Sequence, residues 1–153
     1  MTGPELERHF HTQIPITAAM GLQVRHLRPG SIRLVAPLEA NVNDKMTAFG
    51  GSLASLLTLA GWGLLHVELG RRELDADVVI QKSEFLYYHP VRGELTAYCD
   101  LPGEQEWERF ITLLKRKRRS RVIVTSWIAG PESAAVTMEG RYAAFLRDPG
   151  ESA

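Results

Sequence analysis

Hydrophobic and polar residues alternate along several stretches of the chain, which is the pattern of a half-buried strand. The alternation runs over residues 21–27 and again over residues 32–38. The Arg-Pro-Gly-Ser segment at 28–31 favours a turn, so the two stretches predict a hairpin. Further strands are predicted at residues 78–88, 95–101, 121–128 and 134–146.

Other stretches favour helices because their apolar residues recur every three or four positions. A short helix is predicted at residues 4–13 and another at 104–117. The second carries acidic residues early and basic residues late, which suits the helix dipole. Its apolar stripe consists of Trp107, Phe110, Ile111 and Leu114.

Residues 52–69 are apolar nearly all round and long enough to cross a bilayer. The same composition is typical of a helix buried inside a soluble domain. Polar residues interrupt the segment, and the chain offers no second span, so we expect a buried helix and no membrane association. The interrupting residues are Ser52, Ser55, Thr58, His66 and Glu68.

The order of these elements indicates an α+β fold. Strands follow one another in hairpins and not in strand–helix–strand units, so the sheet should be largely antiparallel. A curved sheet wrapped around the long apolar helix would bury that helix. The chain has 153 residues and no evident linker. We therefore expect residues 1–153 to form a single domain, with its core at about 12–146 and a frayed tail at 147–153.

The amino-acid composition limits which partners and which cellular compartment we expect for the protein. Eighteen basic and eighteen acidic residues give a formal net charge of zero, so no global charge favours nucleic acid or an anionic membrane. Cys99 is the one cysteine, which excludes an internal disulfide. The first ten residues lack the apolar core of a signal peptide, so we expect a cytoplasmic protein. Neither a metal-binding motif nor a dinucleotide fingerprint occurs, and we expect no metal and no cofactor.

The loop before the buried helix carries the candidate chemistry. Gly50 and Gly51 permit close backbone approach where the loop becomes a helix. The first helical turn leaves N–H groups without partners and carries positive partial charge, which suits an oxyanion. Asn43 adds an amide donor. The structural alternative is a glycine turn in which Ser52 is the N-cap and Asn43 caps the loop.

At this point the chain resembles the hotdog-fold thioesterase superfamily. The loop Asn43–x3–Thr47–x2–Gly50–Gly51 and the strand end at 87–93, Tyr-Tyr-His-Pro-Val-Arg-Gly, carry the likeness. It is closer to one branch, named "putative thioesterases" and now understood as malonyl-acyl carrier protein decarboxylases. The resemblance to this branch covers about residues 12–146, and several separate motifs occur in the same order as in the branch. These motifs are Thr47–Leu53, Leu59–Gly63, Val79–Gln81, Trp107–Phe110 and Gly140–Tyr142.

Two departures from hydrolytic hotdog enzymes bear on the reaction. Those enzymes usually carry His-Gly-Gly, where this chain has Phe49-Gly50-Gly51, and often an acid on the central helix where this chain has Thr58. Thioester hydrolysis needs a base or a nucleophile, and a threonine hydroxyl is a poor base. Decarboxylation needs an oriented, desolvated carboxylate and donors for the enolate oxygen. The missing acid therefore favours decarboxylation.

The resemblance assigns the leading catalytic role to Asn43. Substrate and oxyanion binding is expected at Thr47, Phe49, Gly50, Gly51 and Thr58. Alternative bases or pocket residues are Asp44, His66, His89 and Tyr88, each of which also has an ordinary structural explanation.

The resemblance also implies a homodimer with its active site between subunits. The substrate would be an acyl carrier protein thioester or a coenzyme A thioester. The alternatives are an acyl thioesterase and a non-catalytic module that binds acyl carrier protein. A basic cluster could dock an acidic carrier or form a solvated helix end, and it lacks the interleaved aromatics typical of nucleic-acid binding. It consists of Lys115, Arg116, Lys117, Arg118, Arg119 and Arg121.

Overall fold

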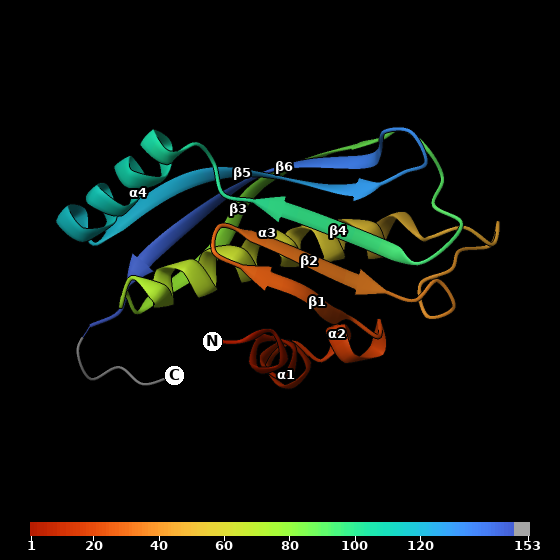
Figure 1. Cartoon of the computed structure of the whole chain (residues 1–153), viewed down its shortest axis with the longest axis horizontal. Coiled ribbons are helices and arrows are strands. Elements are labelled where there is room, and N and C mark those ends of the chain that lie inside the picture. Colours follow the sequence, from red (N-terminus) through yellow and green to blue (C-terminus); the bar gives the residue numbers. More distant parts are fainter. Residues whose placement is uncertain (149–153) are drawn as a thin grey trace.

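The computed structural model describes residues 1–148 as a curved antiparallel sheet against a long helix (Figure 1). The helices are α1 (Gly3–Gln13), α2 (Ile16–Ala19), α3 (Gly50–Arg71) and α4 (Glu104–Lys117). The strands are β1 (Gln23–Arg28), β2 (Ser31–Ala36), β3 (Ala76–Tyr87), β4 (Leu95–Asp100), β5 (Arg119–Ala129) and β6 (Ala134–Leu146). The strand order is β1-β2-β4-β5-β6-β3, and every neighbouring pair is antiparallel.

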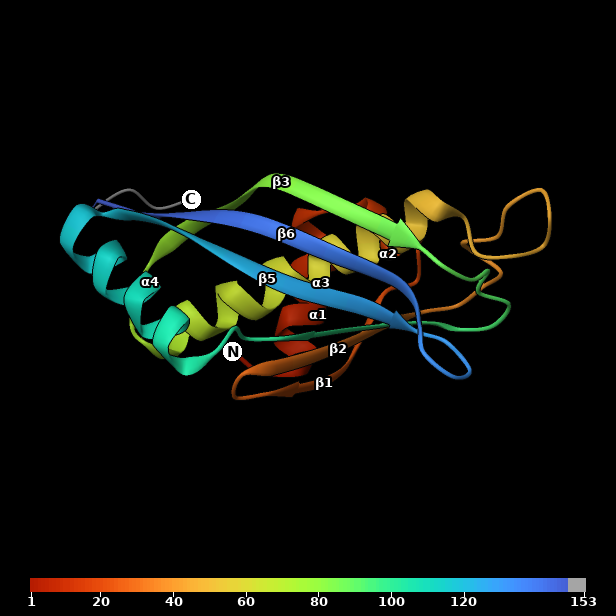
Figure 2. The ribbon, with the colours of Figure 1, turned by 90° about the horizontal axis from the view of Figure 1, so that it is seen from above.

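The sheet wraps around α3, which is the hotdog arrangement expected from the sequence (Figure 2). Alternate residues of β5 are buried, and Ser126 on that face donates a hydrogen bond to the carbonyl of Leu57 in α3 at 3.2 Å. α3 has the length and composition of a membrane span, but 67% of its most apolar window is buried inside the domain. The burial accounts for its apolar character without a membrane.

The two edge strands of the sheet differ in how far they are covered. α1 lies against edge strand β1, where the carboxylate of Glu7 accepts a hydrogen bond from the Val24 amide at 2.8 Å. β3 is the opposite edge, and every residue from Val79 to Tyr87 except the half-buried Phe85 is exposed. A long, partly apolar edge with free backbone groups is a template for pairing with another strand.

The chain end only partly follows the prediction of a frayed tail at 147–153. Arg147 donates hydrogen bonds to Asp75 and Asp77, and its amide donates to the Asp75 carbonyl at 3.0 Å. Asp148 pairs with Arg118 at 2.8 Å. These two residues are therefore anchored to the domain, and residues 149–153 lie outside the described part of the chain.

Close packing of α3 against β6 yields a stability prediction. Gly61 leaves room for Tyr142, whose hydroxyl donates to the Thr58 carbonyl at 2.8 Å, and a Cβ at Gly61 would overlap the tyrosine hydroxyl and ring. We expect Gly61→Ala to lower the free energy of unfolding by about 1–3 kcal/mol, measured by urea denaturation.

Gly70 is the matched control for this substitution. It lies in the last turn of the same helix, and a Cβ there would meet no heavy atom within 4 Å. Gly70→Ala should leave stability unchanged or raise it by up to about 1 kcal/mol. Equal effects of the two substitutions would contradict the packing explanation.

Candidate functional site

The N-terminus of α3 is open to a ligand. Phe49 is the N-cap in extended conformation, and no side chain caps the helix. Within residues 1–148, the amides of Gly50, Gly51 and Ser52 have no hydrogen-bond acceptor. The prediction that Ser52 is the N-cap is wrong, because Ser52 already belongs to the helix. The free amides and the helix dipole favour a negatively charged oxygen here.

Asn43 organises the loop that leads to these amides. Its side-chain oxygen accepts hydrogen bonds from the amides of Lys45 at 2.9 Å and Thr47 at 3.1 Å. Its amide nitrogen donates to the Thr47 hydroxyl at 2.9 Å. Met46, between them, takes a positive φ of 60°. An amide NH2 has two N–H groups, so one remains for a substrate after Thr47 takes the other.

Two aromatic rings pack against the paired glycines. The ring of Phe49 lies where a Cβ of Gly51 would be, so a larger residue at this position would displace the ring. The hydroxyl of Tyr87 donates to the Gly50 carbonyl at 3.0 Å. Burial raises the pKa of Tyr87 above its ordinary value, which keeps this donor protonated.

Tyr87 was missed in the sequence, which pointed to Tyr88 instead. Adjacent residues of a strand face opposite sides, so only one tyrosine of the pair can face α3. The pattern could not decide between them, because apolar and aromatic residues occupy both faces of β3. Tyr88 is exposed, and its amide donates to the Ala135 carbonyl at 2.8 Å.

A cavity of about 350 Å³ lies beside the helix N-terminus, between α2 and the first turns of α3. Phe49, Gly51, Ser52 and Ser55 line it on one side, and Ile16 and Met20 line it on the other. α2 was not predicted from the sequence, because four residues are too few to show helical periodicity. The cavity offers a largely apolar wall next to the free amides, and such a wall weakens the hydration of a bound carboxylate.

The β3–β4 loop forms the other side of the site. The Ala48 amide donates to the Val91 carbonyl at 2.8 Å, which fixes the loop before α3 against this segment. A second cavity, of about 590 Å³, lies between the β3–β4 loop and the β5–β6 hairpin. The predicted candidate His89 lines this cavity together with Arg92 and with Val91, whose carbonyl accepts the Ala48 amide.

Three further side chains, on the loop, on α3 and on β4, are poorly suited to activate water. Asp44 is 80% exposed at its side chain and pairs with Lys45 at 2.9 Å. The Thr58 hydroxyl donates to the Ala54 carbonyl at 2.9 Å and lies within 3.7 Å of the Met138 sulfur. Cys99 is buried, and burial raises the pKa of its thiol to about 12, so it stays protonated.

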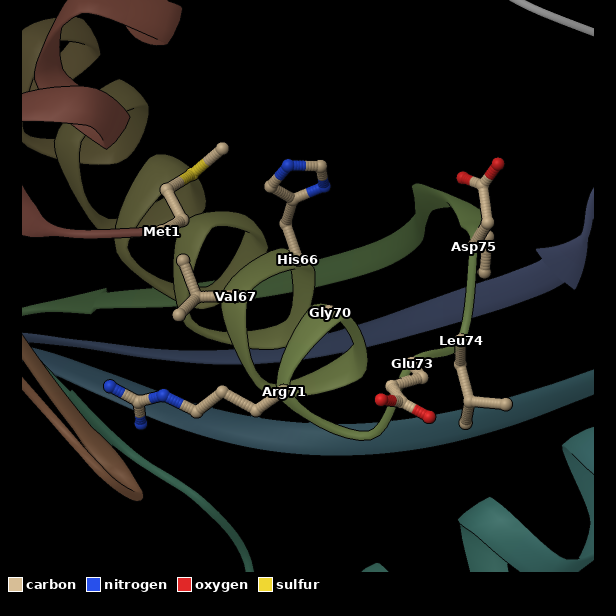
Figure 3. A pocket seen from close by; sticks show the side chains of 9 residues that line it. Met1, His66, Val67, Gly70, Arg71, Glu73, Leu74 and Asp75 are labelled. Atoms are coloured by element: carbon tan, nitrogen blue, oxygen red, sulfur yellow. The ribbon is translucent and has the colours of Figure 1, made fainter.

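His66 lies toward the opposite end of α3 and not beside Asn43. Sixteen residues of helix separate it from Gly50, which corresponds to roughly 24 Å. Its ring stacks on Trp62 at 4.7 Å and on His9 at 5.2 Å. Burial, reinforced by the nearby His9, lowers the pKa of His66. It borders a separate cavity of about 450 Å³, together with Met1 and Asp75 (Figure 3).

The predicted basic cluster follows the end of α4 and the start of β5. Arg118 takes a positive φ of 59° and donates to carbonyls at the end of β6 and to Asp148. The other members are exposed and form no ion pair within residues 1–148: Lys115, Arg116, Lys117, Arg119 and Arg121. Within the same range, no group of three or more His, Cys, Asp or Glu residues could hold a metal ion.

Comparisons with known proteins agree with this fold. A family model described as "Putative thioesterase (yiiD_Cterm)" matches residues 4–146. A crystal structure of a protein of unknown function from Chlorobaculum tepidum TLS is 30% identical, with a TM-score of 0.89 over 95% of this chain and 94% of that one. A "putative thioesterase" from Shewanella oneidensis is 23% identical, with a TM-score of 0.84 over 95% and 97% of the two chains.

More distant structures share the same architecture. A thioesterase from Haemophilus influenzae is 13% identical to this chain and superposes with a TM-score of 0.75 over 99% of this chain and 96% of that one. At this identity the likeness shows the fold alone, and the match supports the hotdog arrangement of sheet and central helix.

Proposed function

Because the chain belongs to the family described as "Putative thioesterase (yiiD_Cterm)", it acts on acyl thioesters, and we propose that its reaction is the decarboxylation of a malonyl group on acyl carrier protein. The product, an acetyl thioester on the carrier, would serve the initiation of fatty acid synthesis in the cytoplasm. A malonyl thioester of coenzyme A has the same reacting group and is the alternative substrate.

One observation carries this proposal: the α3 N-terminus combines free amides with the absence of a suitable base. The donors are the amides of Gly50 and Gly51, and Asn43 lies on the loop beside them. In the described part of the first two helical turns, Gly50–Leu57, there is no acid and no histidine. Such a site stabilises an anion but activates water poorly.

Decarboxylation uses these features directly. The bond between the methylene carbon and the carboxylate breaks, carbon dioxide leaves, and the electron pair remains as the enolate of the thioester. The negative charge collects on the thioester oxygen, where helix amides are best placed to stabilise it. The second amide N–H of Asn43 would orient the thioester, and a proton from water completes the acetyl group.

Thioester hydrolysis is the second candidate, and the family description and neighbouring structures support it at least as well as they support decarboxylation. It would require a base such as Asp44 or His89, neither of which is within a hydrogen bond of the α3 amides in one subunit. A non-catalytic carrier-binding module is the remaining alternative.

Intact mass spectrometry of malonyl-acyl carrier protein distinguishes these reactions. Decarboxylation leaves an acetyl carrier that has lost the mass of carbon dioxide. Hydrolysis leaves the free thiol carrier, and that product would overturn the proposal in favour of a thioesterase. An unchanged malonyl carrier that still binds the protein would support the binding module.

The proposal includes a homodimer that pairs two copies of β3. This edge strand exposes Val79, at 45%, and Ile80, at 37%, together with Leu86 and Tyr87 near its end. α1 already covers the β1 edge, which leaves β3 as the edge available for pairing. Two-fold pairing of β3 would extend the sheet across both subunits and cover these apolar side chains.

A further inference from the structure

The surface around the α3 N-terminus offers little net charge to an acidic carrier protein. Lys45 is paired with Asp44 at 2.9 Å, and Glu94 pairs with Arg25 at 3.4 Å. Glu132 lines the same cavity as Arg92. Positive charges that would attract a carrier are thus balanced at this end of the molecule.

The strong basic surface is at the opposite end. Figure 2 shows α4 at one end of the molecule and the loop before α3 at the other. Arg119 pairs with Phe145 across β5 and β6, whereas Tyr87 pairs with Val136. Nine residues of β6 separate these two rows, which corresponds to roughly 30 Å along the sheet.

This separation is too long for the arm that carries the thioester. Phosphopantetheine has about 13 bonds from phosphorus to sulfur, equivalent to just over four residues of extended chain, or roughly 15 Å. An arm anchored at the basic cluster is therefore too short to carry the thioester to the α3 N-terminus of the same subunit.

Two-fold pairing of β3 changes this distance. A two-fold axis perpendicular to the sheet makes the paired strands antiparallel, so the start of one β3 lies beside the end of the other. If the exposed stretch Val79–Tyr87 pairs about its centre at Ser83, residue 79 of one subunit lies opposite Tyr87 of the other. Asp77, Phe145 and Arg119 lie side by side on β3, β6 and β5 of the first subunit. Asp77 is two residues from position 79, so this row starts close to Tyr87 of the second subunit.

From Tyr87 to Arg119 across the dimer, the path crosses three strand spacings, or roughly 15 Å. This matches the reach of the arm, whereas the path within one subunit is about twice as long. We infer that the basic cluster of one subunit docks the acyl carrier protein whose thioester reacts at the α3 N-terminus of the other subunit. This inference rests on the proposed function and names the docking surface of its macromolecular substrate.

Substitutions in the homodimer test the surface first. Lys115→Glu, Lys117→Glu and Arg119→Glu together reverse three exposed charges of the cluster. The KM for malonyl-acyl carrier protein should rise by about tenfold or more, while turnover of malonyl-pantetheine, which needs no docking, should stay within about twofold. The control variant Arg8→Glu, Arg28→Glu reverses two exposed charges outside α4 and β5 and should leave both substrates unaffected.

Hybrid dimers then test which subunit supplies the surface. Differently tagged chains are co-expressed and the mixed dimers purified. A hybrid of an Asn43→Ala chain with a cluster-reversed chain keeps one intact Asn43 and one intact cluster on opposite subunits. Docking across the dimer predicts about half of the wild-type activity on malonyl carrier, since one site of two is complete.

The reciprocal hybrid joins a wild-type chain to a chain carrying both sets of substitutions. Docking across the dimer predicts that this hybrid keeps the high KM of the cluster-reversed protein. The opposite result, activity in this hybrid and none in the first, would show docking within one subunit and overturn the inference. An unaltered KM in the cluster-reversed homodimer would do the same.

Failure of the proposed function gives a different pattern. If the wild-type protein converts neither malonyl-pantetheine nor malonyl carrier into the acetyl form, the decarboxylase proposal fails. If the protein converts both substrates and the KM for malonyl carrier does not change in the cluster-reversed variant, only the docking inference fails.

Discussion

Replacing Asn43 with alanine is expected to lower kcat/KM for malonyl-acyl carrier protein by about a hundredfold to a thousandfold, the usual cost of one oriented donor in an active site. The substitution removes the amide N–H that remains after Thr47 takes its hydrogen bond. It also removes the acceptor for the amides of Lys45 and Thr47, so the loop loses part of its support. Steady-state kinetics on wild type and variant measure the loss.

Asn43→Asp separates the two effects. Aspartate keeps an oxygen for the Lys45 and Thr47 amides, and the Thr47 hydroxyl can donate to it, so the loop should keep its shape. The aspartate offers no N–H and repels the malonyl carboxylate, so activity should still fall about a hundredfold. Thermal unfolding should stay close to wild type. Near wild-type activity in this variant would reduce Asn43 to a loop-capping residue.

Ile80→Lys is expected to convert the homodimer to a monomer and to reduce carrier turnover to a few per cent or less. Lysine on an edge strand opposes pairing because its charge would be buried between the two copies of β3. Activity falls because the docking cluster and the α3 N-terminus would no longer meet. Light scattering should report the chain mass of 17.1 kDa for the variant and twice that mass for wild type.

Ile123→Lys is the matched control. Ile123 is 42% exposed on β5, close to the 37% of Ile80, but lies two strands away from the β3 edge. This variant should remain dimeric and active. A dimeric, active Ile80→Lys protein would contradict pairing through β3.

Much of the fold follows from local patterns in the sequence. The predicted helix at 104–117 has the same bounds as α4, because its apolar stripe and its charges at both ends agree. The β1–β2 turn was predicted from Pro29-Gly30, and Gly30 takes the positive φ of 78° that favours glycine. The buried helix was evident from its all-round apolar composition.

Other features depend on tertiary contacts that no local pattern reveals. The N-cap is Phe49 and not Ser52, and the phenylalanine ring packs over Gly51. The position of β3 at the edge, paired with β6, depends on long-range strand order. That order also decides that Tyr87 reaches Gly50.

The loop before α3 remains the predicted site, and the structure shows which of its predicted residues lie together. Spacing and resemblance identified Asn43, Thr47 and the paired glycines, which the structure brings together at the start of α3. The same reasoning grouped His66 with them, although about 24 Å of helix separates it from Gly50 within a subunit. Sequence spacing fixes the face of a helix but not the distance from the substrate.

Isotopic labelling of the substrate identifies most directly which of its bonds breaks. Malonyl-acyl carrier protein labelled with ¹³C at the free carboxyl is incubated with the wild-type protein and followed by ¹³C NMR. Decarboxylation predicts that the label appears as carbon dioxide and bicarbonate while the carrier becomes acetylated. Appearance of the label in free malonate, with the carrier thiol released, would contradict it and establish a thioesterase.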